Sequence, residues 1–126
     1  MRKLKLMIVD DHAAFRQVVK SLLQPLTADW VECEDGQEAV DRYPQAQPDL
    51  VLMDIEMKPL DGLQACARVK ARFPDARIII LTQYDDADLH AAAAKAGACG
   101  YVLKENLPQV RELIEAEDRR QQPALR

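Results

Sequence analysis

Four short runs of the chain are almost continuously apolar, and they limit the folds that it can adopt. They are LKLMIVD (4–10), DLVLMD (49–54), RIIILT (77–82) and CGYVLK (99–104). A strand that is buried on one face alternates apolar and polar residues, whereas continuous apolar runs of this length are typical of strands covered on both faces. A weaker candidate at 30–32 brings the number of predicted strands to five. The pattern therefore predicts a parallel sheet between two layers of helices.

Helical patterns fill the gaps between these runs. The clearest is one apolar stripe at helical spacing, formed by Phe15, Val18, Val19, Leu22 and Leu23. Three further helix starts are predicted where an oxygen acceptor precedes a Glu or Gln by three residues: Asp35 with Glu38, Asp61 with Gln64, and Asn106 with Gln109. Short right-handed crossovers would join five such strand and helix units into a single doubly wound α/β domain.

Length and composition agree with one ordinary globular domain. The chain has 126 residues, of which 48% are hydrophobic and 30% charged, and no segment has the apolar length needed to span a bilayer. We expect the domain to cover 1–118 and the residues 119–126 to form a tail or the start of a linker. The net charge of -4 disfavours direct binding to nucleic acid. Three cysteines without a paired spacing indicate reduced thiols in a cytoplasm.

Polar residues close the strands of the predicted sheet. Asp10 and Asp11 end the first run, Asp54 the second, Thr82 the next and Lys104 the last. In an open parallel sheet, ligands bind at the carboxyl ends of the strands. Three carboxylates in one pocket would repel one another, and a hard divalent cation such as Mg²⁺, or Mn²⁺ in its place, would remove that conflict. The sequence therefore predicts a metal site at this edge.

Asp54 could act there as an oxygen nucleophile toward a phosphoryl group and form an acyl phosphate. The metal and Lys104 would neutralise the transferred oxygens, and Thr82 would donate one hydrogen bond to them. Taken alone, Asp10 and Asp11 would be read as helix-capping residues, but their pairing with Asp54 favours the metal site. His12 and His90 have no Cys or His at a ligand spacing, so surface or capping roles are expected for them.

Five motifs in order give the chain a specific resemblance to a known family. They are DD at 10–11, LVLMDIEM at 50–57, DG at 61–62, LTQYDD at 81–86 and GYVLK at 100–104. Over residues 4–117 the chain resembles the CheY-like receiver domain of bacterial response regulators. LTQYDD and GYVLKENLP are most similar to receivers of the NarL/FixJ type, which usually precede a helix-turn-helix domain. The resemblance implies a flavodoxin-like (βα)5 fold with strand order 2-1-3-4-5.

The resemblance also implies roles for the strand-end residues. Asp54 matches the phosphorylated aspartate, Asp11 a direct metal ligand and Asp10 a ligand that acts partly through water. Glu56 matches the residue whose backbone carbonyl completes the metal site. Lys104 matches the lysine that contacts the phosphoryl oxygen. A domain of this kind catalyses its own phosphorylation and dephosphorylation and is not a turnover enzyme.

A switch and an output surface are implied as well. Thr82 and Tyr101 match a pair in which the hydroxyl moves toward the phosphoryl group and the aromatic ring turns inward behind it. The output surface would cover roughly 86–117. The implied partners are a sensor histidine kinase or phosphotransfer protein, and a second copy of the chain on phosphorylation. DNA would be reached only through a C-terminal helix-turn-helix domain, if the full-length protein has one.

The chain departs from the family pattern at two positions. Lys58 stands where a proline commonly follows the aspartate by four residues, and Pro59 comes next. Glu105 follows Lys104 where many receivers have proline, and a cis bond there would cost several kcal/mol more than before proline. The shape of the loop after Asp54 and the geometry of the Lys104–Glu105 bond are therefore open.

Two other functions are compatible with parts of this pattern. A phosphatase of the haloacid-dehalogenase class also uses a strand-end Asp with Mg²⁺, but it wants a second Asp where this chain has Glu56, and the chain is short for a cap domain. A receiver-like interaction module that is never phosphorylated would lack acidic residues or the lysine, which this chain has. Labelling by acetyl phosphate distinguishes these alternatives.

Overall fold

A computed structural model describes residues 2–121 of the chain. Five strands alternate with five helices along the sequence, and two 3₁₀ turns precede β2 and α5. The strands are β1 (Leu4–Val9), β2 (Thr27–Cys33), β3 (Leu50–Met53), β4 (Ile78–Thr82) and β5 (Gly100–Leu103). The helices are α1 (Ala13–Leu23), α2 (Gly36–Ala46), α3 (Gly62–Arg72), α4 (Ala87–Ala96) and α5 (Leu107–Gln121).

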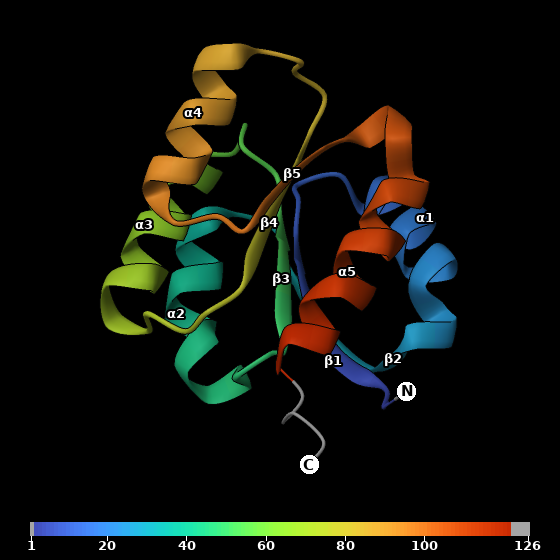
Figure 1. Ribbon diagram of the computed structural model, residues 1–126. Coiled ribbons are helices and arrows are strands. Elements are labelled where there is room, and N and C mark those ends of the chain that lie inside the picture. The colour runs from blue at the N-terminus through green and yellow to red at the C-terminus, as the bar shows by residue number, and fades with distance from the viewer. Residues whose placement is uncertain (1, 122–126) are drawn as a thin grey trace.

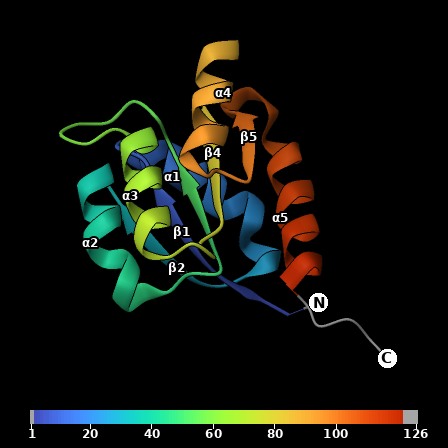
Figure 2. The same cartoon turned by 60° about the vertical axis from the view of Figure 1, so that its left-hand side comes forward.

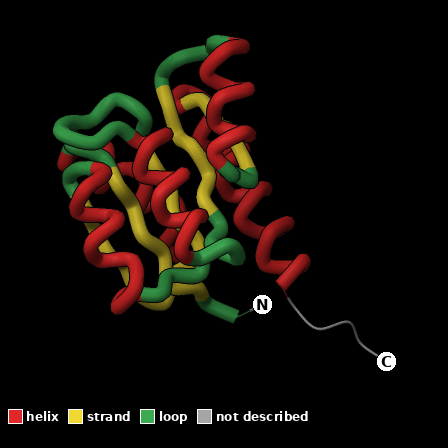
Figure 3. Tube along the Cα trace, turned by 90° about the vertical axis from the view of Figure 1, so that its left-hand side faces the viewer, coloured by secondary structure: helices red, strands yellow, loops and turns green. Residues whose placement is uncertain are grey.

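The strands form one parallel sheet in the order β2-β1-β3-β4-β5, which confirms the predicted topology. Helices α1 and α5 cover one face, and α2, α3 and α4 cover the other (Figure 1). Figure 3 looks onto the second face. Because both faces are covered, alternate residues of each strand enter two separate apolar clusters, with Met7 and Val9 in one and Leu6 and Ile8 in the other. This explains why the strands read as continuous apolar runs.

Two of the three predicted helix starts have the expected hydrogen bonds. The Asp35 carboxylate accepts from the backbone N–H of Glu38, and Asp61 forms a full capping box with Gln64. At the third, Asn106 lies in a 3₁₀ turn and its side-chain amide donates to the side chain of Gln109 instead. That helix therefore starts from a tight turn that begins at Lys104.

The first helix differs from its predicted stripe. Val19 and Leu23 are fully buried, but Val18 is 53% exposed, so its inclusion in the buried stripe was wrong. Arg16 is buried in its place, because residues 16, 19 and 23 share a face at helical spacing. The second strand extends over seven residues rather than the three predicted at 30–32.

Helix α5 runs from the site edge to the opposite edge of the sheet and ends at Gln121 (Figure 1). The predicted tail 119–126 lies partly outside the described residues, and the domain boundary stays a prediction. Within residues 2–121, no helix has both the length and the apolar character required to cross a membrane.

Candidate functional site

Three carboxylates meet where the central strands end, as predicted. Asp10 and Asp11 follow β1, and Asp54 follows β3, its neighbour in the sheet. One ligand atom each from Asp10, Asp11, His12 and Asp54 lies within 4.8 Å of all the others. Figure 2 shows that the long loop after β3 extends beyond this end of the sheet. The backbone places the group, since the Asp54 N–H donates to Val9 at 2.9 Å and the Asp10 N–H donates to Cys33 at 3.0 Å.

Lys104 reaches the same group from the far edge strand. Its Nζ lies 2.8 Å from one oxygen of Asp10 and 3.5 Å from Oδ1 of Asp54. The ammonium also stands over the Phe15 ring, 4.5 Å from its centroid. Both carboxylates are buried, so Lys104 interacts with them in a medium of low dielectric. The cation is thereby held beside the predicted nucleophile.

The pocket disfavours a charge on Asp54. Burial, together with the negative charge of Asp10, raises the pKa of Asp54 to about 6, against the opposing effect of Lys104. A hydrogen bond from the backbone N–H of Ile55 to Oδ1 also favours the charged form. A carboxylate with a raised pKa beside two other carboxylates is a site where a cation would be stabilising.

Glycine is required where the next helix approaches the phosphoacceptor candidate. The Gly62 N–H donates to the Ile55 carbonyl at 2.8 Å. A Cβ at Gly62 would lie only 1.8 Å from the carbonyl oxygen of Asp54. The DG pair at 61–62 therefore joins two functions, since Asp61 caps α3 and Gly62 lets that helix pack against the backbone of Asp54.

The two predicted switch residues, Thr82 and Tyr101, are connected through the backbone of one residue, Tyr84. Thr82 is fully buried, and its hydroxyl oxygen accepts a hydrogen bond from the N–H of Tyr84 at 3.2 Å. The carbonyl of the same residue, Tyr84, accepts from the Tyr101 hydroxyl at 2.6 Å. The Tyr101 ring also packs against His90, with ring centroids 4.7 Å apart. A movement of Thr82 would thus disturb the bond that holds Tyr101.

The two loops at the mouth of the pocket touch through side chains. Tyr84 donates a hydrogen bond from its hydroxyl to the carboxylate of Glu56. Glu56 and Lys58 are both exposed, and the Lys58–Pro59 bond is cis. The Lys104–Glu105 bond, which the sequence left open, is not cis.

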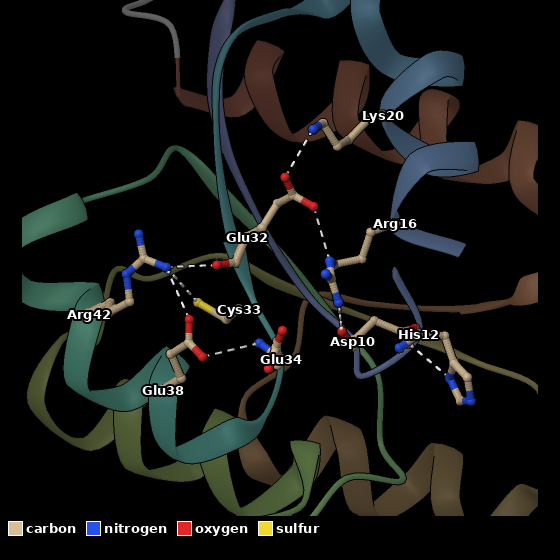
Figure 4. A network of polar contacts seen from close by, with 9 residues as sticks. All are labelled: Asp10, His12, Arg16, Lys20, Glu32, Cys33, Glu34, Glu38 and Arg42. Atoms are coloured by element: carbon tan, nitrogen blue, oxygen red, sulfur yellow. Dashed lines mark hydrogen bonds and ion pairs between the residues drawn. The ribbon is translucent and has the colours of Figure 1, made fainter. Parts of the chain in front are cut away.

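Sequence reasoning missed two residues of this site. His12 lies within the carboxylate group, with Nδ1 2.9 Å from Asp11 and 3.2 Å from Asp10, a contact that the expected surface or capping role did not include. Its position directly after the two aspartates was the available signal. Arg16 lies behind the site and donates to the carbonyl of Asp10 (Figure 4). The signal for its burial was its position on the same face of α1 as the buried residues Val19 and Leu23.

The donor set suits a hard divalent cation. Asp10, Asp11 and Asp54 offer carboxylate oxygens within one small volume, and such oxygens are the ligands that Mg²⁺ and Mn²⁺ accept. A cation there would also offset the burial and the repulsion from Asp10 that together raise the pKa of Asp54. The residues present therefore fit the predicted metal.

Comparison with known proteins gives one consistent result. Residues 6–116 match the family model of the response regulator receiver domain. The chain is 37% identical over 105 residues to the transcriptional regulatory protein DegU of Brevibacillus brevis, a match that covers 82% of this chain and 44% of the relative. It is 36% identical over 102 residues to the chemotaxis protein CheY of Listeria monocytogenes, covering 80% of this chain and 86% of the relative.

A solved structure agrees. A two-component response regulator of the LuxR family from Aurantimonas sp. SI85-9A1 superposes with a TM-score of 0.84 at 31% identity, over 90% of this chain and 84% of that one. The chain spans about half the length of the transcriptional regulators that it matches, such as the one from Brevibacillus brevis.

Proposed function

The chain belongs to the response regulator receiver domain family of two-component systems, and from this premise we propose that Asp54 is the residue that accepts the phosphoryl group. The observation that carries the proposal is the juxtaposition of the Asp54 carboxylate with two further aspartates and the Lys104 ammonium in a single pocket. Asp54 is the one of the three aspartates that follows β3, the strand in the middle of the sheet.

The proposed metal ligands are the carboxylates of Asp10, Asp11 and Asp54 with the backbone carbonyl of Glu56. When bound, Mg²⁺ or Mn²⁺ would supply positive charge that lowers the pKa of Asp54 and neutralises oxygens of the incoming phosphoryl group.

The chain's own residues then carry out the transfer. An oxygen of ionised Asp54 forms a bond to phosphorus while the bond from phosphorus to the donor group breaks, which yields an acyl phosphate. Lys104, already 3.5 Å from Asp54, pairs with an oxygen of the transferred group. Charge stabilisation and positioning account for most of the catalysis in such transfers. The domain is thus modified by its own chemistry and is not a turnover enzyme.

The acyl phosphate would favour one of two existing conformations of the output surface. Thr82 would turn its hydroxyl toward a phosphoryl oxygen and give up the hydrogen bond from Tyr84. The loop after β4 would follow, and the Tyr101 hydroxyl would lose its place on the Tyr84 carbonyl. The ring of Tyr101 could then turn inward and reshape the surface of α4, β5 and α5.

The proposed partners are a sensor histidine kinase or phosphotransfer protein, and a second copy of the chain on phosphorylation. A DNA-binding domain outside this sequence would supply any transcriptional output. A cytoplasmic location is supported by three free cysteines, since disulfides are rare there. Burial raises the pKa of the Cys33 and Cys66 thiols to about 11, which keeps them protonated and unreactive.

Acetyl phosphate labelling in the presence of Mg²⁺ tests the proposal. We expect the intact mass of the wild-type chain to increase by one phosphoryl group, and Asp54→Asn to show no such increase. Asp35→Asn, which alters only the cap of α2, is the control and should label like the wild type. Labelling of Asp54→Asn would refute the assignment. Sustained turnover of a generic phosphomonoester would favour the phosphatase alternative instead.

A further inference from the structure

The loop that carries Asp10 and Asp11 is closed by a side chain from inside α1. Arg16 Nη1 donates a hydrogen bond of 2.6 Å to the carbonyl oxygen of Asp10. That carbonyl belongs to the peptide unit that joins Asp10 to Asp11, so its direction sets where both carboxylates begin. The contact spans the turn from the end of β1 to the first turns of α1 (Figure 4).

The same guanidinium is held from a second direction. Nε of Arg16 donates to Glu32 of the neighbouring strand β2 at 3.0 Å, and the other oxygen of Glu32 accepts from Lys20 at 2.9 Å. These two hydrogen bonds, that from Lys20 first, hold the pKa of Glu32 below its usual value. Arg42 of α2 donates to the backbone carbonyl of Glu32. The Arg16 side chain is 11% exposed, so its orientation is fixed by packing as well as by charge.

This arrangement stands at the position where α2, α3 and α4 each have a capping side chain. Asp35, Asp61 and Asp86 each accept a backbone N–H at the start of α2, α3 and α4. At α1, within the described chain, the N-cap residue is His12 and its side chain makes no capping hydrogen bond. Within the β1–α1 loop the Asp10 carboxylate accepts the N–H of His12 at 2.8 Å, and Arg16 supplies the contact that ties the loop to the body of α1.

We infer that Arg16 is a positioning residue for the metal-binding carboxylates, which it orients through the Asp10 carbonyl while Glu32 holds it in place. The inference rests on the proposed function in that it assumes a divalent metal at Asp10, Asp11 and Asp54. Arg16 itself touches neither the metal nor the phosphoryl group. Its effect passes through the backbone of Asp10.

The two separate contacts explain why an arginine is needed. A guanidinium presents donors in a rigid planar fork, so Nε can serve Glu32 while Nη1 serves the carbonyl. A lysine carries equal charge but has a single nitrogen on a flexible stem. Outer-shell residues that orient metal ligands typically contribute 10–100-fold to metal affinity, as an order of magnitude.

Direct metal binding tests the inference without any phosphoryl donor. Mn²⁺ is titrated into the full chain, and free Mn²⁺ is followed by its electron paramagnetic resonance signal. For Arg16→Met we expect a Kd raised by about tenfold. Arg77→Met is the matched control, because it breaks another partly buried arginine pair, with Glu117 at 2.8 Å, at the opposite edge of the sheet. Its Kd should stay within about twofold of the wild type. The Kd of Lys20→Met, which removes the other, partly exposed partner of Glu32, should do the same.

Arg16→Lys keeps the inference testable if the methionine variant does not fold. It preserves the charge, and we expect it to lose about half of the effect on a logarithmic scale, or about threefold in Kd. A wild-type Kd in a folded Arg16 variant, or an equal loss in Arg77→Met, would overturn the inference. Failure of the proposed function looks different, because the wild-type chain would then bind Mn²⁺ yet gain no phosphoryl group from acetyl phosphate.

Discussion

The Asp54 side chain is stabilised more by protonation than by ionisation in the metal-free fold. Its pKa rises from 3.8 to about 6, so the folded chain binds a proton that the unfolded chain has released. The stabilising effect of this proton is complete below about pH 4 and is lost as the pH rises through about 6. At neutral pH the charged residue therefore destabilises the fold, by at most about 3 kcal/mol for a shift of this size.

The first prediction concerns Asp54→Asn without metal. Asparagine keeps the shape of the side chain and removes its charge, so the free energy of unfolding in urea with EDTA should rise by about 2 kcal/mol at pH 8. The gain should shrink at about pH 5, where Asp54 is mostly protonated. Asp75→Asn, at an exposed position, should change stability by less than about 0.5 kcal/mol at either pH.

Bound metal should make the wild type more stable than Asp54→Asn. Mg²⁺ that binds only the folded chain adds stability in proportion to the logarithm of its concentration above Kd. The wild type should gain this stability, and Asp54→Asn should gain much less because it lacks one ligand. Equal gains in both proteins would contradict the assignment of Asp54 as a metal ligand.

At the scale of elements, the position of α3 depends on a missing side chain. Gly62→Ala would place a Cβ 1.8 Å from the carbonyl oxygen of Asp54 and 2.8 Å from its carbonyl carbon. Backbone atoms cannot move aside as a side chain can, so we expect a loss of at least about 3 kcal/mol in the free energy of unfolding. Gly100→Ala is the comparison, since its Cβ would meet the end of the Leu113 side chain at 3.0 Å. It should cost clearly less in the same urea titration.

The loop between β4 and α4 gives a third prediction. Tyr101→Phe removes the hydrogen bond to the Tyr84 carbonyl and with it a contact that holds the partly buried ring in its present position against the core. A hydrogen bond of this kind contributes about 1 kcal/mol, so a conformation with the ring turned further inward should become more accessible. We expect beryllofluoride, a phosphoryl mimic, to bind about fivefold more tightly with Mg²⁺ present, as measured by NMR titration.

Tyr43→Phe is the control for that titration, because Tyr43 packs against Phe73 between α2 and α3, away from the switch. Its affinity for beryllofluoride should match the wild type. An unchanged affinity in Tyr101→Phe would show that the hydroxyl does not restrain the switch.

Most elements could be predicted from local patterns because their causes are local. Continuous apolar runs identified β1, β3, β4 and β5, and the Asp61 capping box located the start of α3. The full length of β2 could not be read in this way, since edge strand β2 has exposed residues such as Ala28 and Asp29 that break the apolar pattern. The role of Arg16 could not be predicted either: its position marks the buried face of α1, but its partner Glu32 lies in a different element.

At the scale of the whole molecule, ion pairs fasten the last turns of α5 to the edge opposite the site. Glu117 and Asp118 are buried there, where Arg77 Nη1 and Arg2 Nε approach to 2.8 Å and 3.1 Å. Arg2 also reaches Asp49 at 3.2 Å. Consecutive acidic residues on a helix point in different directions, so the two pairs together fix both the position and the rotation of this end of α5.

The fourth prediction follows from this fastening. Arg77→Met removes the ion pair of Arg77 with the buried Glu117 carboxylate and should lower the free energy of unfolding by about 2 kcal/mol, less than for a fully buried pair because Arg77 is partly exposed. Arg111→Met breaks an exposed pair with Glu115 on the same helix and should cost about 0.3–0.5 kcal/mol. Urea titrations of both variants make the comparison, and equal losses would argue against the fastening.

The residues that form the site could be predicted from the sequence because the last residues of parallel strands lie at the same edge of the sheet. Asp10, Asp11, Asp54 and Lys104 are all found there. The connection of Thr82 to Tyr101 through the backbone of Tyr84 could not be predicted, since it depends on how one loop is shaped. The same holds for the contact of Tyr84 with Glu56.

The ion pair between Lys104 and Asp10 joins residues 94 positions apart in the sequence. Such a contact closes a long loop of chain. The entropy lost on closing this loop must be offset by the contacts of the strands between Asp10 and Lys104. On the ribosome, Asp10 and Asp11 therefore emerge long before the lysine that completes their pocket. A nascent chain that stops before β5 would carry all three aspartates yet lack this partner, so the ability to accept phosphate should appear only when synthesis of the domain is essentially finished.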